Sequence, residues 1–133
     1  MISIVIVSHS EKVAEGAAEI AQEMNTAGVT LRPAGGTGDG RIGTNAELIV
    51  KAFEEVYTGD DILAFADLGS SVLSTEMAID MLDPEIGKKV HIVNAPLVEG
   101  VVFATIQAGL TEDVAEIIAV AEDAKNLPKG SAN

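Results

Sequence analysis

The stretch that decides the fold stands at the start of the chain. It reads Ile2-Ser3-Ile4-Val5-Ile6-Val7-Ser8-His9-Ser10. From Ile2 to Val7 the residues are β-branched and, apart from one serine, apolar, which is typical of a strand buried on both faces. Strands of this kind occur in parallel sheets covered by helices, so we expect residues 2–7 to form a strand of an α/β domain.

The hydrophobic pattern changes directly after this strand. Apolar residues recur at helical spacing and predict a helix over residues 11–24, with Ser10 as its N-cap. The apolar positions that define this spacing are Val13, Ala17, Ile20 and Met24.

Short apolar runs and helical patterns continue to alternate along the chain. Further strands are expected at residues 29–31, 62–66 and 90–93. Further helices are expected after a cap at Thr44 or Asn45, over residues 69–82 ending at Asp83-Pro84, near 98–108, and over 112–125 with Thr111 as cap. Residues 35–43 contain five glycines and must form a loop.

This alternation predicts an α/β fold with an open, doubly wound parallel sheet. Right-handed crossovers favour the strand order 2-1-3-4 with helices on both faces. We expect one domain over residues 1–127 and a flexible tail over 128–133. In such a sheet, chemistry collects at the carboxyl ends of strands one and three, where the winding reverses.

Composition excludes several classes of function. The formal charge of −13, from 21 acidic and 8 basic residues, opposes binding to nucleic acid or to an anionic membrane surface. The absence of cysteine excludes disulfides, thiolate zinc sites and cysteine nucleophiles. No stretch is long and apolar enough for a membrane-spanning helix, so a cytoplasmic location is expected.

Two side chains are placed for chemistry at the predicted switch point. His9 is the second residue after the first strand, and Asp67 directly follows the third. A carboxylate beside an imidazole holds one ring nitrogen as N–H, leaves the lone pair of the other free, and stabilises a cation on the ring. This pair therefore predicts a nucleophilic histidine oriented by Asp67.

Two loops could supply donors for a phosphoryl group near His9. Gly69, Ser70 and Ser71 lie where the third helix begins, and backbone N–H groups at a helix N-terminus bind phosphate. Gly36 and Thr37, after the second strand, could bring further N–H groups to the same point.

Each of these residues also has a structural explanation. Taken singly, His9 would be a loop residue, while Asp67, Ser70 and Ser71 would be helix caps. Only their combination at one switch point favours phosphoryl chemistry. We interpret the second histidine, His91, as structural.

Nucleotide-binding motifs are weak or absent. Gly38–Gly43 matches the pattern GxGxxG, but this segment lies well past the second strand instead of following the first. There is no GxxxxGK[ST] sequence. We expect neither a cofactor nor a metal ion.

Four segments together resemble a known family. They are Ile4-Val5-Ile6-Val7-Ser8-His9-Ser10, Gly40-Arg41-Ile42-Gly43-Thr44, Asp67-Leu68-Gly69-Ser70 and Ala95-Pro96-Leu97-Val98-Glu99-Gly100. In this order they resemble the phosphotransferase subunits of bacterial dihydroxyacetone kinases, which are similar to the IIA domains of mannose-type sugar phosphotransferase systems. The likeness covers nearly the whole chain.

The resemblance implies a phosphorelay. His9 would accept a phosphoryl group from the histidine carrier protein of the phosphoenolpyruvate-dependent system, and Asp67 would hydrogen-bond His9. The phosphoryl group would pass to ADP on the nucleotide-binding subunit of dihydroxyacetone kinase. The resemblance also implies a homodimer, with residues 96–100 at a dimer or partner surface. Mannose-type relatives exchange a C-terminal strand between subunits, whereas we expect helix there.

Two alternatives remain open from the sequence. The chain could be the IIA component of a sugar transporter, or a regulatory module that accepts no phosphate.

Overall fold

A computed structural model of the chain describes residues 1–130. Strands and helices alternate along most of it. The strands are β1 (Ser3–Ser8), β2 (Thr30–Gly35), β3 (Ile62–Ala66) and β4 (Val90–Ile92). The helices are α1 (Glu11–Gln22), α2 (Ala46–Val56), α3 (Gly69–Met81), α4 (Pro84–Gly87), α5 (Leu97–Ala108) and α6 (Val114–Asp123), with a final 3₁₀ turn at Ala124–Asn126.

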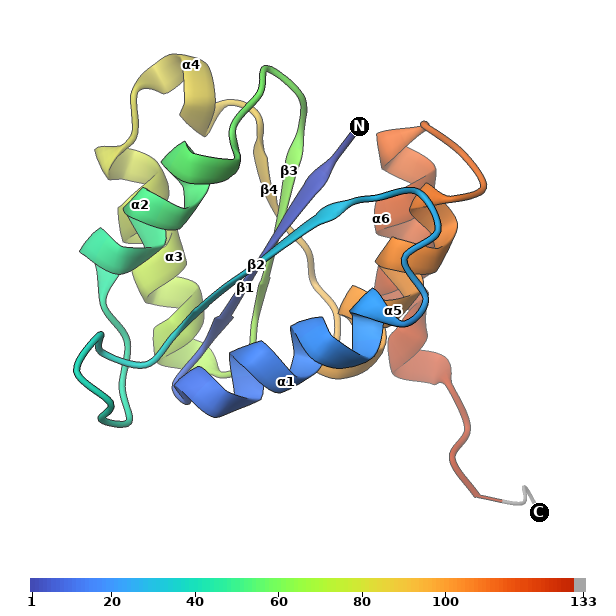
Figure 1. Cartoon of the computed structure of the whole chain (residues 1–133), viewed down its shortest axis with the longest axis horizontal. Coiled ribbons are helices and arrows are strands. Elements are labelled where there is room, and N and C mark those ends of the chain that lie inside the picture. Colours follow the sequence, from blue (N-terminus) through green and yellow to red (C-terminus); the bar gives the residue numbers. More distant parts are fainter. Residues whose placement is uncertain (131–133) are drawn as a thin grey trace.

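The four strands form one parallel sheet in the order β2-β1-β3-β4. Figure 1 shows α1, α5 and α6 on one face of the sheet and α2, α3 and α4 on the other. The predicted α/β fold, strand order and two-sided helix cover are confirmed. β1 and β3 are neighbours at the centre, with Val7 beside Ala66, so both strands end at the same edge.

Each face of the sheet has its own apolar core. Alternate residues of β1 point to opposite faces, so Ile4 and Ile6 pack with α1, α5 and α6, whereas Val5 and Val7 pack with α2 and α3. All four side chains are fully buried, as the opening run of the sequence predicts.

Helix α1 turns a different face to the core from the one that the apolar spacing suggests. Its buried side chains are Ala14, Ala17 and Ala21, whereas Val13 and Ile20 are exposed. Small side chains let α1 lie close to β2 and α5. The predicted N-cap is confirmed, since the Ser10 hydroxyl accepts from the N–H of Val13.

Other boundaries differ from the predicted ones. β2 extends to Gly35 through Pro33, which an edge strand tolerates because its outer N–H positions need no partner. Helix α6 is capped by Asp113 and not by Thr111. The sequence prediction missed α4, which starts at Pro84 with Asp83 as its cap. For α2, Asn45 is the cap.

The end of the chain lies outside the regular elements. Residues 128–130 form no helix or strand, and the rest of the predicted tail lies outside the described residues. Lys129 forms an ion pair with Glu99 of α5 (2.7 Å). Among residues 1–130, no helix has both the length and the apolar character needed to cross a bilayer.

Candidate functional site

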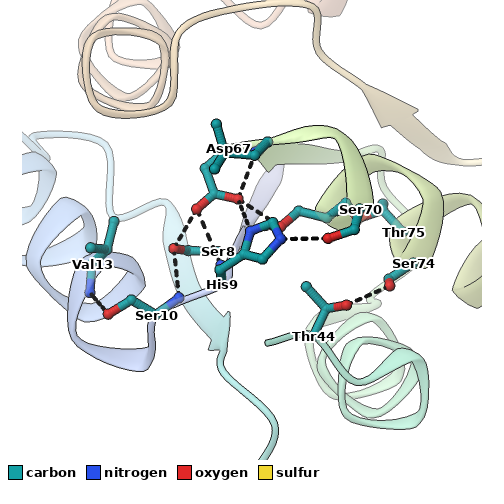
Figure 2. A network of polar contacts seen from close by, with 11 residues as sticks. Ser8, His9, Ser10, Val13, Thr44, Asp67, Ser70, Ser74 and Thr75 are labelled. Carbon is teal, nitrogen blue, oxygen red and sulfur yellow. Dashed lines mark hydrogen bonds and ion pairs between the residues drawn. The ribbon is translucent and has the colours of Figure 1, made fainter. Parts of the chain in front are cut away.

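The sheet topology brings His9 and Asp67 into contact. His9 follows β1, Asp67 follows β3, and these strands are paired in parallel. His9 Nδ1 lies 3.0 Å from Asp67 Oδ1 (Figure 2). The side chains are 25% and 18% exposed, so the pair lies at the surface but is partly shielded from water.

Asp67 is surrounded by hydrogen-bond donors. Its Oδ2 accepts from the hydroxyl of Ser8 (2.7 Å) and the backbone N–H of His9 (3.1 Å). Its Oδ1 accepts from the backbone N–H of Leu68 (2.7 Å) and the hydroxyl of Ser71 (2.6 Å), besides its contact with the His9 ring. Donors to a carboxylate favour its charged form.

These donors determine the charge of Asp67. Partial burial by itself raises the pKa of the carboxyl group, but the hydrogen bonds from Ser71, Ser8 and His9 outweigh burial and hold the pKa of Asp67 well below its usual range. Asp67 is therefore a fixed negative charge at neutral pH.

Ser71 lies on the Nδ1 side of the imidazole. Its side chain is fully buried, and its hydroxyl oxygen is 2.9 Å from His9 Nδ1. Since the hydroxyl has one hydrogen and donates it to Asp67, its oxygen can only accept from His9. Both neighbours of Nδ1 are thus acceptors, and they select the tautomer with the proton on Nδ1.

Ser70 lies on the opposite side of the ring. Its hydroxyl contacts His9 Nε2, and the Nδ1–H tautomer makes Nε2 the acceptor in this contact (Figure 2). Ser70 and Gly69 form the first turn of α3, which no side chain caps. The backbone N–H groups of Gly69 and Ser70 have no acceptor within residues 1–130. Nε2 therefore contacts the hydroxyl of a residue in the first turn of α3, where two backbone N–H groups are unbonded within the described part of the chain.

The donors of Gly36 and Thr37 are engaged elsewhere. The N–H of Gly36 donates to the carbonyl of Ser8 (3.0 Å), and the hydroxyl of Thr37 donates to Asp39. The glycine loop instead contacts His9 through Gly43, whose N–H donates to the carbonyl of His9 (2.8 Å). The structure therefore brings the hydroxyls of Ser70 and Ser71 to the ring, with Gly69 next to Ser70 in the chain, whereas the donors of Gly36 and Thr37 bond within the surrounding backbone and loop.

The site opens onto the protein surface. Leu68 beside Asp67 is 65% exposed, and Ile42 beside Gly43 is 75% exposed. Two cavities of about 300 and 270 Å³ lie elsewhere, and His9 lines neither of them. An imidazole between exposed aliphatic side chains can be reached by the surface of another protein.

His91 forms a second histidine–carboxylate pair away from this site. His91 Nε2 lies 2.8 Å from Asp61 Oδ1, and Asp61 precedes β3 whereas Asp67 follows it. His91 thus lies toward the opposite end of the sheet from His9. Within residues 1–130, no group of three or more histidine and carboxylate side chains is arranged to hold a metal ion.

Comparison with known proteins places most of the chain in one family. The family model described as PTS system fructose IIA component (EIIA-man) matches residues 3–118. A PEP-dependent dihydroxyacetone kinase 2 phosphoryl donor subunit DhaM from Listeria innocua is 46% identical over 108 residues, which cover 81% of this chain and 86% of that protein. A phosphotransferase subunit DhaM of the PTS-dependent kinase from Lactococcus lactis is 36% identical, with 81% and 85% covered.

Some relatives are much longer than this chain. The DhaM subunit from Klebsiella michiganensis is 42% identical over 95% of this chain, but the match spans only 27% of that protein. Among solved structures, the crystal structure of a protein of unknown function, EF1359, superposes with a TM-score of 0.88 at 39% identity, covering 99% of this chain and 98% of that one. The chain belongs to the mannose-type IIA family of the phosphotransferase system, and within that family it is similar to the DhaM phosphoryl donor subunits of dihydroxyacetone kinases.

Proposed function

We propose that this chain is a phosphohistidine carrier with His9 as the phosphoryl acceptor. His9 takes the phosphoryl group from the histidine carrier protein of the phosphoenolpyruvate-dependent system. It passes the group to ADP on the nucleotide-binding subunit of dihydroxyacetone kinase. The names of the similar proteins, phosphoryl donor subunits of PEP-dependent dihydroxyacetone kinases, support this assignment.

One observation carries the proposal. His9 Nδ1 contacts two acceptors, Asp67 Oδ1 at 3.0 Å and Ser71 Oγ at 2.9 Å, so the lone pair of the ring lies on Nε2. In the transfer, Nε2 forms a bond to phosphorus while the bond from phosphorus to the donor's ring nitrogen breaks, and the electron pair of that bond returns to the donor. The positive charge that develops on the ring is stabilised by Asp67.

The first turn of α3 is suited to the transferred group. Phosphoryl transfer spreads charge over three equatorial oxygens, and donors fixed around them stabilise it. The first turn of α3 supplies three candidate donors, which are the backbone N–H groups of Gly69 and Ser70 and the hydroxyl of Ser70, and this hydroxyl contacts His9 Nε2. We assign these three groups to the phosphoryl oxygens and Ser71 to the orientation of the ring.

The partners are proteins in this proposal. The exposed Leu68 and Ile42 beside the site suit contact with a protein surface. We further propose that the chain acts as a homodimer in the cytoplasm and that residues 1–127 form the phosphocarrier domain.

The family match also supports a second candidate for the recipient of the phosphoryl group. The matching family is described as a sugar-system IIA component. Delivery of phosphate to a sugar transporter is therefore the second candidate, and it uses the same chemistry at His9.

The experiment measures labelling from phosphoenolpyruvate in the presence of the two general carrier proteins. Wild-type protein and His9→Ala are compared with His91→Ala, which removes the histidine of the other His–Asp pair. We expect acid-labile, base-stable phosphate on wild type and His91→Ala and none on His9→Ala. Labelling of His9→Ala at the wild-type level would contradict the role of His9. If neither wild type nor the variants were labelled, the result would support a regulatory module that accepts no phosphate.

A second step of the experiment identifies the recipient of the phosphoryl group. The labelled protein is mixed with the dihydroxyacetone kinase subunits, ADP and dihydroxyacetone. Loss of the label with formation of dihydroxyacetone phosphate supports the kinase. Retention of the label, followed by its transfer to a sugar-transporter component, supports the second candidate.

A further inference from the structure

Ser8 is a fully buried polar residue at the carboxyl end of β1, whose other residues apart from Ser3 are apolar. Its side chain lies between the backbone that carries His9 and the carboxylate of Asp67 (Figure 2). The pairing of β1 with β2 does not require a hydroxyl there, because Ser8 pairs with Gly35 through the backbone.

The direction of the Ser8 hydrogen bonds is fixed by its neighbours. The backbone N–H of Ser10 donates to Ser8 Oγ (3.0 Å), so this oxygen acts as an acceptor there. The single hydroxyl hydrogen is then available for Asp67 Oδ2 at 2.7 Å, which is a carboxylate and can only accept. Ser8 therefore joins the N-cap residue of α1 to the carboxylate behind His9.

The same carboxylate oxygen accepts from the backbone of His9 (3.1 Å). Two donors from consecutive residues thus hold Oδ2, while Leu68 and Ser71 donate to Oδ1. With Oδ2 held in this way, Oδ1 is directed at His9 Nδ1. The other side of the His9 backbone is held by the N–H of Gly43.

We propose that Ser8 is a positioning residue for the phosphoryl-transfer site. It acts through Asp67, by holding Oδ2 so that Oδ1 meets the Nδ1–H of His9, and it does not touch the phosphoryl group. This role rests on the proposed function of His9 as the acceptor.

The test removes the hydroxyl and compares an equivalent serine of the same strand. In Ser8→Ala we expect phosphorylation of His9 to be about tenfold slower, which corresponds to one hydrogen bond to a charged group. The matched control is Ser3→Ala, at the other end of β1, where a buried hydroxyl donates to the carbonyl of Val56 (3.4 Å). This control should transfer at the wild-type rate.

Two further variants separate positioning from packing. Ser8→Thr keeps the hydroxyl and should recover most of the rate. Ser8→Cys keeps nearly the volume of serine but donates weakly, so it should remain slow, and it replaces Ser8→Ala if the alanine variant does not fold. Equal rates in Ser8→Cys and wild type would overturn the proposal.

A spectroscopic measurement tests the inference without any partner protein. Nitrogen-15 shifts of the His9 ring report which nitrogen carries the proton, and carbon-13 titration reports the pKa of Asp67. In Ser8→Ala or Ser8→Cys the Nδ1–H tautomer should lose population, and the pKa of Asp67 should rise toward its usual value, because one of its donors is lost. Spectra identical to wild type would overturn the role of Ser8. If wild type is not labelled at all, the proposed function fails, and these spectra still decide whether Ser8 positions Asp67.

Discussion

Replacing Asp67 with asparagine changes one atom of the site and removes its charge. The carboxylate accepts five hydrogen bonds, two on Oδ2 and three on Oδ1. An amide has one oxygen and one NH₂ group, so the NH₂ group must replace either Oδ1 or Oδ2. The donors that bonded to the replaced oxygen then face the N–H bonds of the amide. If the NH₂ group faces His9, it favours the tautomer with the proton on Nε2, which blocks the nucleophile.

The magnitude follows from the geometry of the pair. A unit charge on the imidazole about 4 Å from the carboxylate is stabilised by about 4 kcal/mol at the effective dielectric constant of a protein surface. The pair is partly exposed, and solvent screens part of this energy. If about 3 kcal/mol of it remains in the transition state, phosphorylation of Asp67→Asn slows by about 10²-fold.

The assay is the single-turnover rate of labelling by the phosphorylated histidine carrier protein. Asp61→Asn is the matched control, because it makes the same change in the His91 pair and should leave the rate unchanged. Thermal unfolding of both variants checks that they are folded. A rate for Asp67→Asn within threefold of wild type would refute the assignment of Asp67 as the charge that stabilises the reacting ring.

Three further predictions concern the pH dependence of stability, the Ser71 hydroxyl and two glycines. The pKa of Asp67 is lower in the folded state than in the unfolded state, so its ionisation stabilises the fold above about pH 4, the unfolded value. This stabilisation is lost as the pH falls toward the folded-state pKa. In urea titrations, the difference in unfolding free energy between wild type and Asp67→Asn should therefore shrink from pH 5 to pH 2. Ser71→Ala should slow labelling about tenfold, whereas Ser74→Ala, one turn further along α3, should not. Gly100→Ala should destabilise the fold by about 1 to 3 kcal/mol, because the added Cβ would lie 2.8 Å from the Cβ of Ala95. Gly16→Ala has open space around the added Cβ and should stabilise α1 by about 0.5 to 1 kcal/mol. Chemical denaturation of the two variants distinguishes these opposite signs.

The fold could be predicted from the sequence because its strands are short apolar runs separated by helical patterns. Right-handed crossovers then left few topologies, and the predicted order was correct. The inward face of α1 could not be predicted in this way. Ranking residues by hydrophobicity selects Val13 and Ile20, but the residues that α1 buries against the sheet and α5 are the small Ala14, Ala17 and Ala21.

The contact between His9 and Asp67 could also be predicted, because it follows from two parallel strands ending at one edge. The roles of the surrounding donors could not. The side of the ring on which Ser71 lies depends on the rotational phase of α3, and a sequence does not show that the N–H of Gly36 is bonded to Ser8. No separate role for Ser8 could be predicted, because the expected strand ends at Val7 and a serine directly after a strand is typical of a loop, whereas the observed strand includes Ser8. The burial of its side chain, which marks it as part of the site, appears only in the structure.

The saturation of Asp67 by donors has a consequence for the direction of transfer. In a Ser-His-Asp triad the histidine must take a proton from the nucleophile and return it. Here the histidine is itself the proposed nucleophile, its proton stays on Nδ1, and a carboxylate with four other donors and a lowered pKa does not remove it. In the proposed reaction, the transfer step therefore moves a phosphoryl group without moving a proton. Because the ring carries the same charge when the group arrives and when it leaves, one arrangement of Asp67, Ser71 and Ser8 would serve both directions, as the proposed carrier role between two protein partners requires.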